Sequence, residues 1–518
     1  MRDCKPGDSM GIHAGGNMSL SSRVVRNTIY NISGQTIILV VAFFVIPLLI
    51  RGMGLERFGI LALVWSFIGY FSLFDLGLGR ALTTLVARNL KNNPNAIAPL
   101  AWTGFGLLVF LGIAGALTIF AIAPWVVQEL LKMPVALHVE TLTALYLLAA
   151  TFPFLITQAG FRGILEGLQR FDIVNSVNVI LGLFNFGGAL LVIQFSTHLA
   201  LLVAVVIIGR LIGWFVSLIF CFKLIPDLRK YRFPNSEITR KLLSFGGWMS
   251  VTNVVGPLMV YLDRFLIGAW LSVTAVAYYT TPYDVVTKLW IIPGALVGAL
   301  FPVFSAFQSS DPNNIKALFS SAMKYILFLM FPLTLLIIAF AQEGLTFWID
   351  TNFSTHSTTV LQWLSVGVFI NSLAYVPFAL IQGMGRPDIT AKLHLFELPF
   401  YLICIFFLIS HFGIIGAAIA WTIRVFFDFI FLFFLVKRLL FRNFPLKLSF
   451  MFTIIASLIG LLLISFISDT TTKIWVFLLI LAAFLTVSYY CLFTEEERFN
   501  LLNIFRIRRR HLGNNHEK

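Results

Sequence analysis

Long apolar runs separated by short polar segments fill most of this 518-residue chain. A run of about 20 apolar residues is long enough to cross the hydrocarbon core of a bilayer as a helix. The pattern therefore predicts an all-α integral membrane protein with about fourteen transmembrane helices. The expected spans are 28–50, 58–79, 98–123, 141–161, 173–195, 199–222, 242–269, 273–303, 322–342, 358–382, 391–410, 413–436, 448–468 and 473–494.

The composition supports a chain that faces lipid rather than water. Hydrophobic residues make up 59% of it and charged residues only 12%, whereas soluble proteins carry roughly 25% charged residues. Cys4, Cys221, Cys404 and Cys491 are scattered, with no CxxC spacing. Since neither a metal-binding pattern nor a disulfide framework is present, we expect no metal and no cofactor.

The net charge of +14 is distributed as in a membrane protein. The basic residues lie in short segments between apolar runs, and not on one folded surface as nucleic-acid binding requires. If the N-terminus is cytoplasmic, only Arg51, Arg57, Lys132 and Lys473 fall in outside segments. This bias predicts an even number of spans and two cytoplasmic termini. We expect no nucleic-acid partner, and we expect the basic stretch 506–510 to bind anionic membrane lipids.

Two similar segments indicate an internal repeat. Gly167, Arg170, Asp172 and Ile173 recur at the same spacing as Gly383, Arg386, Asp388 and Ile389. The sixth and twelfth expected helices each carry one central arginine, Arg210 and Arg424, at nearly the same separation. We therefore expect two parallel-repeat lobes of about six helices each, related by an axis along the membrane normal.

The repeat divides the chain into six expected parts. Substrate in transporters built this way binds near mid-membrane, between the two halves. The parts are a cytoplasmic N-terminal tail (1–27), an N-lobe (28–222), a cytoplasmic linker (223–241), a C-lobe (242–438), two extra C-terminal helices (439–494) and a basic cytoplasmic tail (495–518).

Charged residues inside the expected spans are the candidate functional residues. An ionised group at mid-bilayer costs at least about 2.5–3.5 kcal/mol, so it usually faces a protein interior or a watery cavity. The cations are candidates for a substrate-binding cavity wall, and the acids are candidates for binding a coupling ion. The cations are Arg210, Arg264, Lys288 and Arg424, and the acids are Asp263, Asp284, Glu397 and Asp428.

Sequence spacing gives these residues competing interpretations. Asp284 with Lys288, and Arg424 with Asp428, are each spaced to share one helix face. They are either structural ion pairs or cations that exchange a carboxylate for a substrate phosphate, which arginine binds through two parallel hydrogen bonds. Arg210 has no acid within a turn, which favours a ligand-facing role. Arg264 is alternatively close enough to a helix end to extend toward lipid headgroups.

Motifs of covalent chemistry are absent from the sequence. It contains no GxxxxGK[ST] phosphate loop, no HExxH and no GxSxG. The expected outside segments are all short, whereas a membrane polymerase or glycosyltransferase is expected to need a larger outer catalytic loop. We therefore expect neither an enzyme nor an ATP-driven pump.

Several short motifs resemble one known family. The segments 262–268 (LDRFLIG), 276–279 (VAYY), 301–305 (FPVFS), 52–59 (GMGLERFG) and 74–78 (FDLGL) are similar to those of the polysaccharide transporters in the multidrug/oligosaccharidyl-lipid/polysaccharide exporter superfamily. The motifs are collinear, and the resemblance extends from about residue 20 to 440.

The resemblance implies a flippase in a bacterial inner membrane. Its substrate would be an undecaprenyl-diphosphate-linked oligosaccharide, such as an O-antigen, capsule or exopolysaccharide repeat unit. Two lobes would enclose a central, often cationic cavity and work by alternating access. A polysaccharide polymerase and chain-length machinery are candidate partners. The alternatives are a lipid II flippase or a multidrug/cation antiporter of the same superfamily, and, from another class, a membrane polysaccharide polymerase or ligase.

Overall fold

The computed structural model describes residues 20–69, 74–230, 235–305, 312–440 and 448–493, together with 495, 497 and 498. All regular elements within these ranges are helices, which confirms the expected all-α class. The proposed lipid anchor at 506–510 and most of the expected N-terminal tail lie outside the described residues.

The helices fall into two groups along the chain. The first comprises α1 (Leu20–Gly69), α3 (Leu78–Asn92), α4 (Ile97–Trp125), α5 (His138–Gly167), α6 (Phe171–Leu183), α7 (Ala189–Ile193) and α8 (Leu199–Leu224). The second comprises α9 (Ser236–Trp270), α10 (Val273–Val286), α11 (Ile291–Ser305), α12 (Pro312–Ala339), α13 (Ala341–Trp348), α14 (Thr351–Gly383), α15 (Pro387–Leu440), α16 (Leu448–Ser465) and α17 (Thr470–Val487). Short helical segments such as the π-helical η4 (Phe184–Gly188) and the 3₁₀-helical η6 (Thr287–Trp290) connect or extend them.

Two of the longest helices each contain a sharp break at a glycine. Gly54 in α1 has φ 82° and Gly413 in α15 has φ 57°, a backbone region that glycine enters without steric cost. Gly54 lies between two expected spans, and Gly413 is the first residue of the expected span 413–436. By length and composition, ten helices of the described chain could cross a membrane, and α9 and α16 are helical where two further spans are expected. The count of about fourteen spans stays a prediction.

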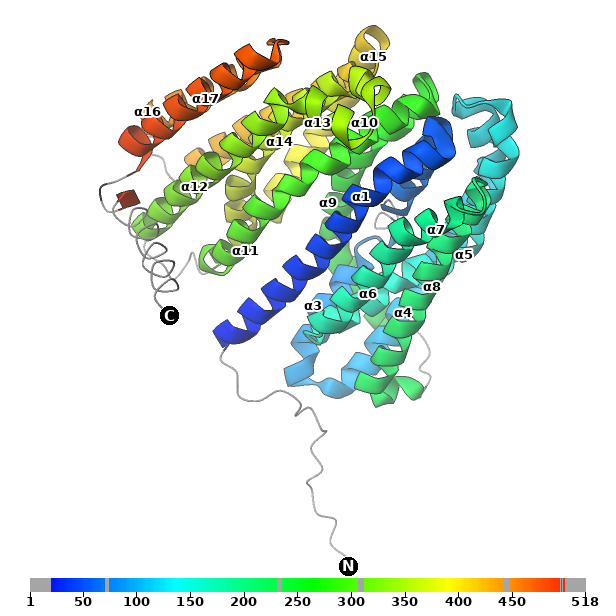
Figure 1. Cartoon of the computed structure of the whole chain (residues 1–518). Helices are drawn as coiled ribbons and strands as arrows, with labels where there is room; N and C mark the ends of the chain where they lie inside the picture. Colours follow the sequence, from blue (N-terminus) through cyan, green and yellow to red (C-terminus); the bar gives the residue numbers. More distant parts are fainter. Residues whose placement is uncertain are drawn as a thin grey trace, which may run out of the picture.

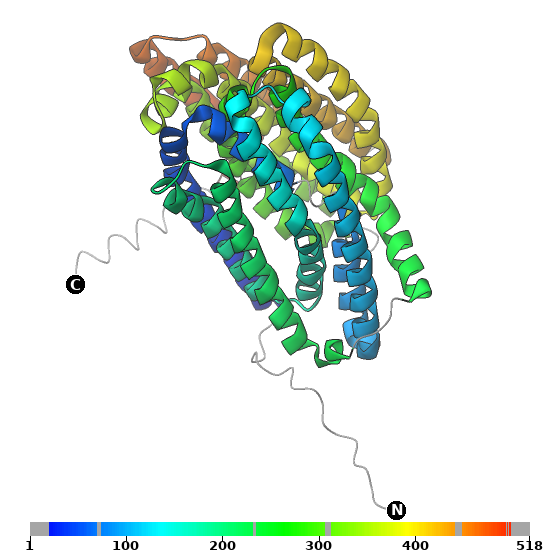
Figure 2. The same ribbon diagram turned by 90° about the vertical axis from the view of Figure 1, so that its right-hand side faces the viewer.

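In the view of Figure 1, helix α1 separates the two groups: helices α3 to α8 lie on one side of it and α10 to α17 on the other. In the turned view, α1 lies toward one edge of the bundle (Figure 2). On the first side α5 packs against α3, α4 and α8, and on the second α14 packs against α10 to α13 and α15. Helix α1 contacts both α6 and α10. The division into lobes at the boundaries given above stays a prediction.

Large apolar side chains cover much of the outside of the bundle. Phe110 on α4, Phe215 on α8, and Phe396, Phe406 and Phe434 on α15 are all exposed. A soluble monomer rarely shows continuous apolar surface on this scale, whereas bilayer hydrocarbon makes such a surface favourable. This distribution agrees with a multi-pass membrane protein.

The two groups of helices are closely joined at one end, which we call the distal end: the end where α1 breaks at Gly54. The Trp348 indole N–H donates to the carbonyl oxygen of Phe43 at 2.7 Å, and the two rings stack with centroids 5.3 Å apart. The Arg51 guanidinium donates to the Ile349 carbonyl oxygen. These contacts hold α1 against α13.

Backbone contacts strengthen the same end. Lys132 N donates to Gly268 O at 3.0 Å, and Val273 N donates to Lys132 O at 3.1 Å. The Lys132 ammonium donates to Trp270 O at 2.5 Å. At Gly59 of α1, a Cβ atom would lie 1.8 Å from Val273 O, so only glycine permits this approach of α1 to α10. The distal end is therefore closed by close packing.

Candidate functional site

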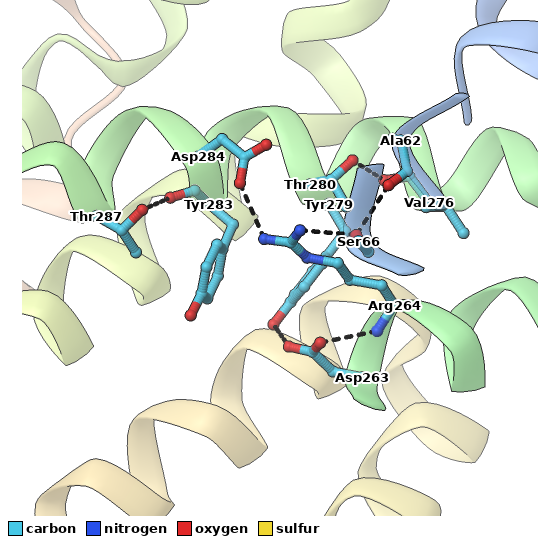
Figure 3. Close-up of polar contacts among 10 residues, drawn as sticks. All are labelled: Ala62, Ser66, Asp263, Arg264, Val276, Tyr279, Thr280, Tyr283, Asp284 and Thr287. Carbon is cyan, nitrogen blue, oxygen red and sulfur yellow. Dashed lines mark hydrogen bonds and ion pairs between the residues drawn. The ribbon is translucent and has the colours of Figure 1, made fainter. Parts of the chain in front are cut away.

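Helix α9 places two adjacent charged residues inside the bundle. Asp263 is fully buried and Arg264 is 4% exposed. Neighbouring residues on a helix point about 100° apart, so the two side chains make different contacts. Arg264 meets α1 and α10, whereas Asp263 meets a tyrosine of α10 (Figure 3).

The Arg264 side chain is held on several sides. Its guanidinium donates to Asp284 Oδ1 at 2.9 Å and to Ser66 Oγ at 2.8 Å. It also lies over the rings of Tyr283 and Tyr261, with centroids 4.8 and 5.1 Å away. Charged hydrogen bonds and cation–π contacts compensate its burial. This geometry corrects the alternative that Arg264 extends toward lipid headgroups.

Asp263 accepts two hydrogen bonds within the same network. The Tyr279 hydroxyl donates to Oδ2, and the backbone N–H of Arg264 donates to Oδ1 at 2.8 Å. Sequence reasoning did not single out Tyr279. The only available signal was its place in the VAYY motif, which resembles the family pattern. A coupling-ion role for Asp263 stays a prediction.

The ion pairs expected within single helices are replaced by other contacts. Asp284 pairs with Arg264, and the described residues show no ion pair between Asp284 and Lys288. The physical reason is local. Helix α10 ends at Val286 and the chain tightens into the 3₁₀ turn η6, where side chains four apart no longer share a face. Lys288 is consequently exposed.

Arg424 on α15 also makes contacts that sequence spacing did not predict. It is 8% exposed, its Nη1 donates to the Met259 sulfur at 3.5 Å, and its guanidinium lies 5.7 Å from the Tyr401 ring centroid. Across the described residues, no ion pair joins it to Asp428. It lies close enough to Asp263 for a Coulombic interaction. The structure thus brings both Arg264 and Arg424 near one buried acid, Asp263.

The two remaining candidate acids lie together on α15. Glu397 and Asp428 are both buried, and His394 joins them. One nitrogen or oxygen atom from each lies within 4.8 Å of the others, a set that could hold a cation. His394 was missed at the sequence level, although its spacing from Glu397 places both on one helix face.

Arg210 lies away from this network. It shares a face of α8 with Trp214 and Ser217, by helical spacing. Trp214 donates to Thr157 Oγ1 at 2.8 Å, and Ser217 accepts from Gln158 at 3.0 Å, so this face is directed toward α5. The described part of the chain contains no ion pair of Arg210, and its Nε is buried without a hydrogen-bond partner. Of the four candidate cations, the structure brings only Arg264 and Arg424 together.

Comparisons with known proteins agree on one family. The sequence model of the family described as "Polysaccharide biosynthesis protein" matches residues 24–308. The chain is 30% identical over 428 residues to a Shigella flexneri protein named "Putative O-antigen transporter", covering 80% of this chain and 98% of that protein.

Solved structures with the same fold belong to one superfamily. A multidrug resistance transporter of the MATE family, in an inward-facing conformation, matches with a TM-score of 0.66 at 16% identity, covering 80% of this chain and 94% of that one. The lipid II flippase MurJ, in an inward closed conformation, matches with a TM-score of 0.66 at 15% identity, covering 90% and 98%. The chain therefore belongs to the polysaccharide biosynthesis protein family and has the fold of multidrug/oligosaccharidyl-lipid/polysaccharide transporters.

Proposed function

We propose that this protein is a flippase that moves an undecaprenyl-diphosphate-linked oligosaccharide across a bacterial inner membrane. The observation that carries the proposal is the likeness to a protein named as an O-antigen transporter over 98% of that protein's length. The buried pair Arg264 and Arg424 supplies matching chemistry. A diphosphate cannot enter hydrocarbon unshielded, and buried guanidinium groups are suitable partners for it.

Arg424 is the better candidate for direct contact with the diphosphate. Arg264 is already bonded to Asp284 and Ser66. Among the described residues, Arg424 donates a hydrogen bond to the weak acceptor Met259, lies against one ring and forms no ion pair, and its Nε has no hydrogen-bond partner. An incoming phosphate could therefore bind Arg424 without breaking an ion pair. Arg210 and Lys288, which lie elsewhere, would meet the substrate at other points of its path.

Alternating access would proceed through rearrangement of the two proposed lobes, 28–222 and 242–438. With both termini in the cytoplasm, the closed distal end would be the outer end, as expected of an inward-facing state. The contacts of Trp348 and Lys132 would then break when the transporter opens outward. Residues 223–241 would link the lobes, and 439–494 would add helices outside the repeat.

The rival functions differ in the substrate they would carry. A lipid II flippase shares the diphosphate chemistry and is favoured by the fold likeness to MurJ, which covers 90% of this chain. The cationic substrate of a multidrug/cation antiporter would meet two buried arginines, whose like charge disfavours its binding. We also propose that the protein catalyses no covalent step and works beside a polysaccharide polymerase and chain-length machinery.

Replacing Arg424 tests the proposed function. Arg424→Gln should slow flipping of lipid-linked oligosaccharide in proteoliposomes by roughly 10- to 100-fold, because a hydrogen bond to a charged group contributes about 1.5–3 kcal/mol. Arg424→Lys should retain part of the activity, since it keeps the charge and loses the planar fork. The exposed Arg386, replaced by Gln, is the matched control.

Two outcomes would decide against the proposal. Wild-type rates in a variant lacking both Arg210 and Arg424 would reject a cationic substrate path. Flipping of lipid II, with no flipping of undecaprenyl-diphosphate-linked oligosaccharide, would favour the rival flippase. The same liposomes serve both comparisons, so a poorly inserted variant is recognised by its protein content.

A further inference from the structure

Three titratable side chains of α15 meet at one buried point. His394 and Glu397 are three residues apart and share a helix face, while Asp428 comes from the part of α15 that follows the break at Gly413. Glu397 is 3% and Asp428 7% exposed. His394 Nε2 lies 3.8 Å from Asp428 Oδ1, too far for a hydrogen bond.

The hydrogen bonding of this cluster is incomplete. Both oxygens of Glu397, Oδ1 of Asp428 and Nδ1 of His394 are buried without a partner. Glu397 and Asp428 each place a carboxylate oxygen within 4.8 Å of the other. Ionised carboxylates only accept hydrogen bonds, so two facing carboxylates need a donor between them. One proton would supply it.

The net charge of Glu397, Asp428 and Arg424 also favours the binding of one added positive charge. Arg424, one turn before Asp428, interacts electrostatically with His394, Glu397 and Asp428. Two ionised carboxylates and one guanidinium leave a single net negative charge. A proton neutralises the group, whereas a divalent ion would leave it positive. Neutrality is the favoured state for charges removed from water.

Among the described residues, the helices packed around the cluster provide no cation paired with Glu397 or Asp428 that could take the place of the proton. Phe378 of α14 stacks on the His394 ring with centroids 6.1 Å apart. In the described residues no lysine and no arginine forms an ion pair with the three side chains. The charged and titratable groups near Arg424 and the cluster are Asp263 and Arg264 of α9, Tyr279 and Tyr283 of α10, and Tyr401 of α15.

We propose that His394, Glu397 and Asp428 hold one exchangeable proton, and that this proton controls whether Arg424 is free to bind the anionic headgroup. The proton lies between the two carboxyl groups, and the His394 imidazole is the neighbouring acceptor through which it leaves. The role of the proton in headgroup binding rests on the proposed flippase function; the existence of the proton site does not.

Proton binding at the cluster and headgroup binding are linked because both depend on Arg424. When the proton leaves, the added negative charge draws the guanidinium toward Glu397 and Asp428, away from the substrate. When the proton returns, the attraction weakens and Arg424 is available to phosphate. Because the coupling is reciprocal, headgroup binding must also favour protonation.

The first test uses the purified full-length protein without substrate. Infrared difference spectra between mildly acidic and alkaline buffer should show the C=O band of one buried protonated carboxyl group. The band should disappear in Glu397→Gln and in Asp428→Asn, either of which suffices if the other does not fold. It should persist in Asp388→Asn, a partly exposed acid on the same helix.

The second test measures binding of undecaprenyl diphosphate to the same protein. Acidification should tighten binding by roughly tenfold, within the usual range of coupling between linked sites. Binding to Glu397→Gln should not depend on pH. If the wild-type protein bound undecaprenyl diphosphate with equal affinity in both buffers, the proposal that the proton controls Arg424 would be wrong.

The outcomes separate the proton site from the proposed function. A proton site without any flipping of lipid-linked oligosaccharide would reject the flippase and keep the site. Flipping in a protein that lacks the carboxyl band would reject the site and keep the flippase. Stoichiometric binding of Na⁺ or Zn²⁺ that is lost in both acid variants would replace the proton by a metal ion and overturn the proposal.

Discussion

Arg264→Ala is expected to lower the free energy of unfolding by about 3 kcal/mol, because removing one partner of a buried ion pair leaves an uncompensated charge. This is the lower end of the usual range, since the Asp284 side chain keeps 40% exposure while that of Arg264 has 5%. Asp263 would lose its neighbouring cation at the same time. Flipping should fall with stability, because the network joins α1, α9 and α10.

The measurement is thermal or denaturant unfolding in detergent, with two controls. Arg386→Ala removes an exposed pair with Asp388 and should cost less than about 1 kcal/mol. The double variant Arg264→Met with Asp284→Asn removes both charges and should recover much of the loss. If Arg264→Ala were as stable as Arg386→Ala, the network would have no structural role.

The sequence predicts the fold well because membrane spans are a local property. Each span is a run of apolar residues whose length must match the bilayer, and the described residues are helical through most of each of these runs. The breaks inside α1 and α15 fall where polar or glycine-containing segments separate expected spans. The positive φ values of Gly54 and Gly413 show how two spans can follow one another with almost no loop.

The candidate site was only partly predictable because its contacts join distant parts of the chain. Spacing within one helix suggested that Asp284 would pair with Lys288, yet its partner Arg264 comes from α9. Ser66, which also binds Arg264, is 198 residues away in sequence. Periodicity identifies which charges are buried, but the packing of α1, α9, α10 and α15 decides which of them meet.

His394 illustrates the same limit. A histidine within an apolar run has no charge pattern that distinguishes it from a structural residue. It becomes a candidate only when the hairpin in α15 brings Asp428 beside it and leaves Glu397 with no hydrogen-bond partner. Arg424 then links this cluster to Asp263 and Arg264, so the two groups of charges act on one another.

Gly59→Ala should prevent closure of the distal end and stop transport while leaving the protein folded. A Cβ at this position would lie 1.8 Å from Val273 O and 2.7 Å from Val273 C, and backbone atoms cannot move aside as a flexible side chain could. Helices α1 and α10 must separate. Alanine itself favours the helix by roughly 0.5–1 kcal/mol over glycine, so local folding should not suffer.

Labelling of one introduced cysteine reports whether the distal end is closed. Ala62 of α1 is 4% exposed, so Ala62→Cys in a cysteine-free background should resist a water-soluble maleimide in the closed form. Adding Gly59→Ala should make this cysteine reactive and abolish flipping in proteoliposomes. Gly344→Ala is the matched control, because nothing lies within 4 Å of its added Cβ. An unreactive Ala62→Cys together with normal flipping in the Gly59→Ala protein would mean that close approach of α1 to α10 is not needed for the transport cycle.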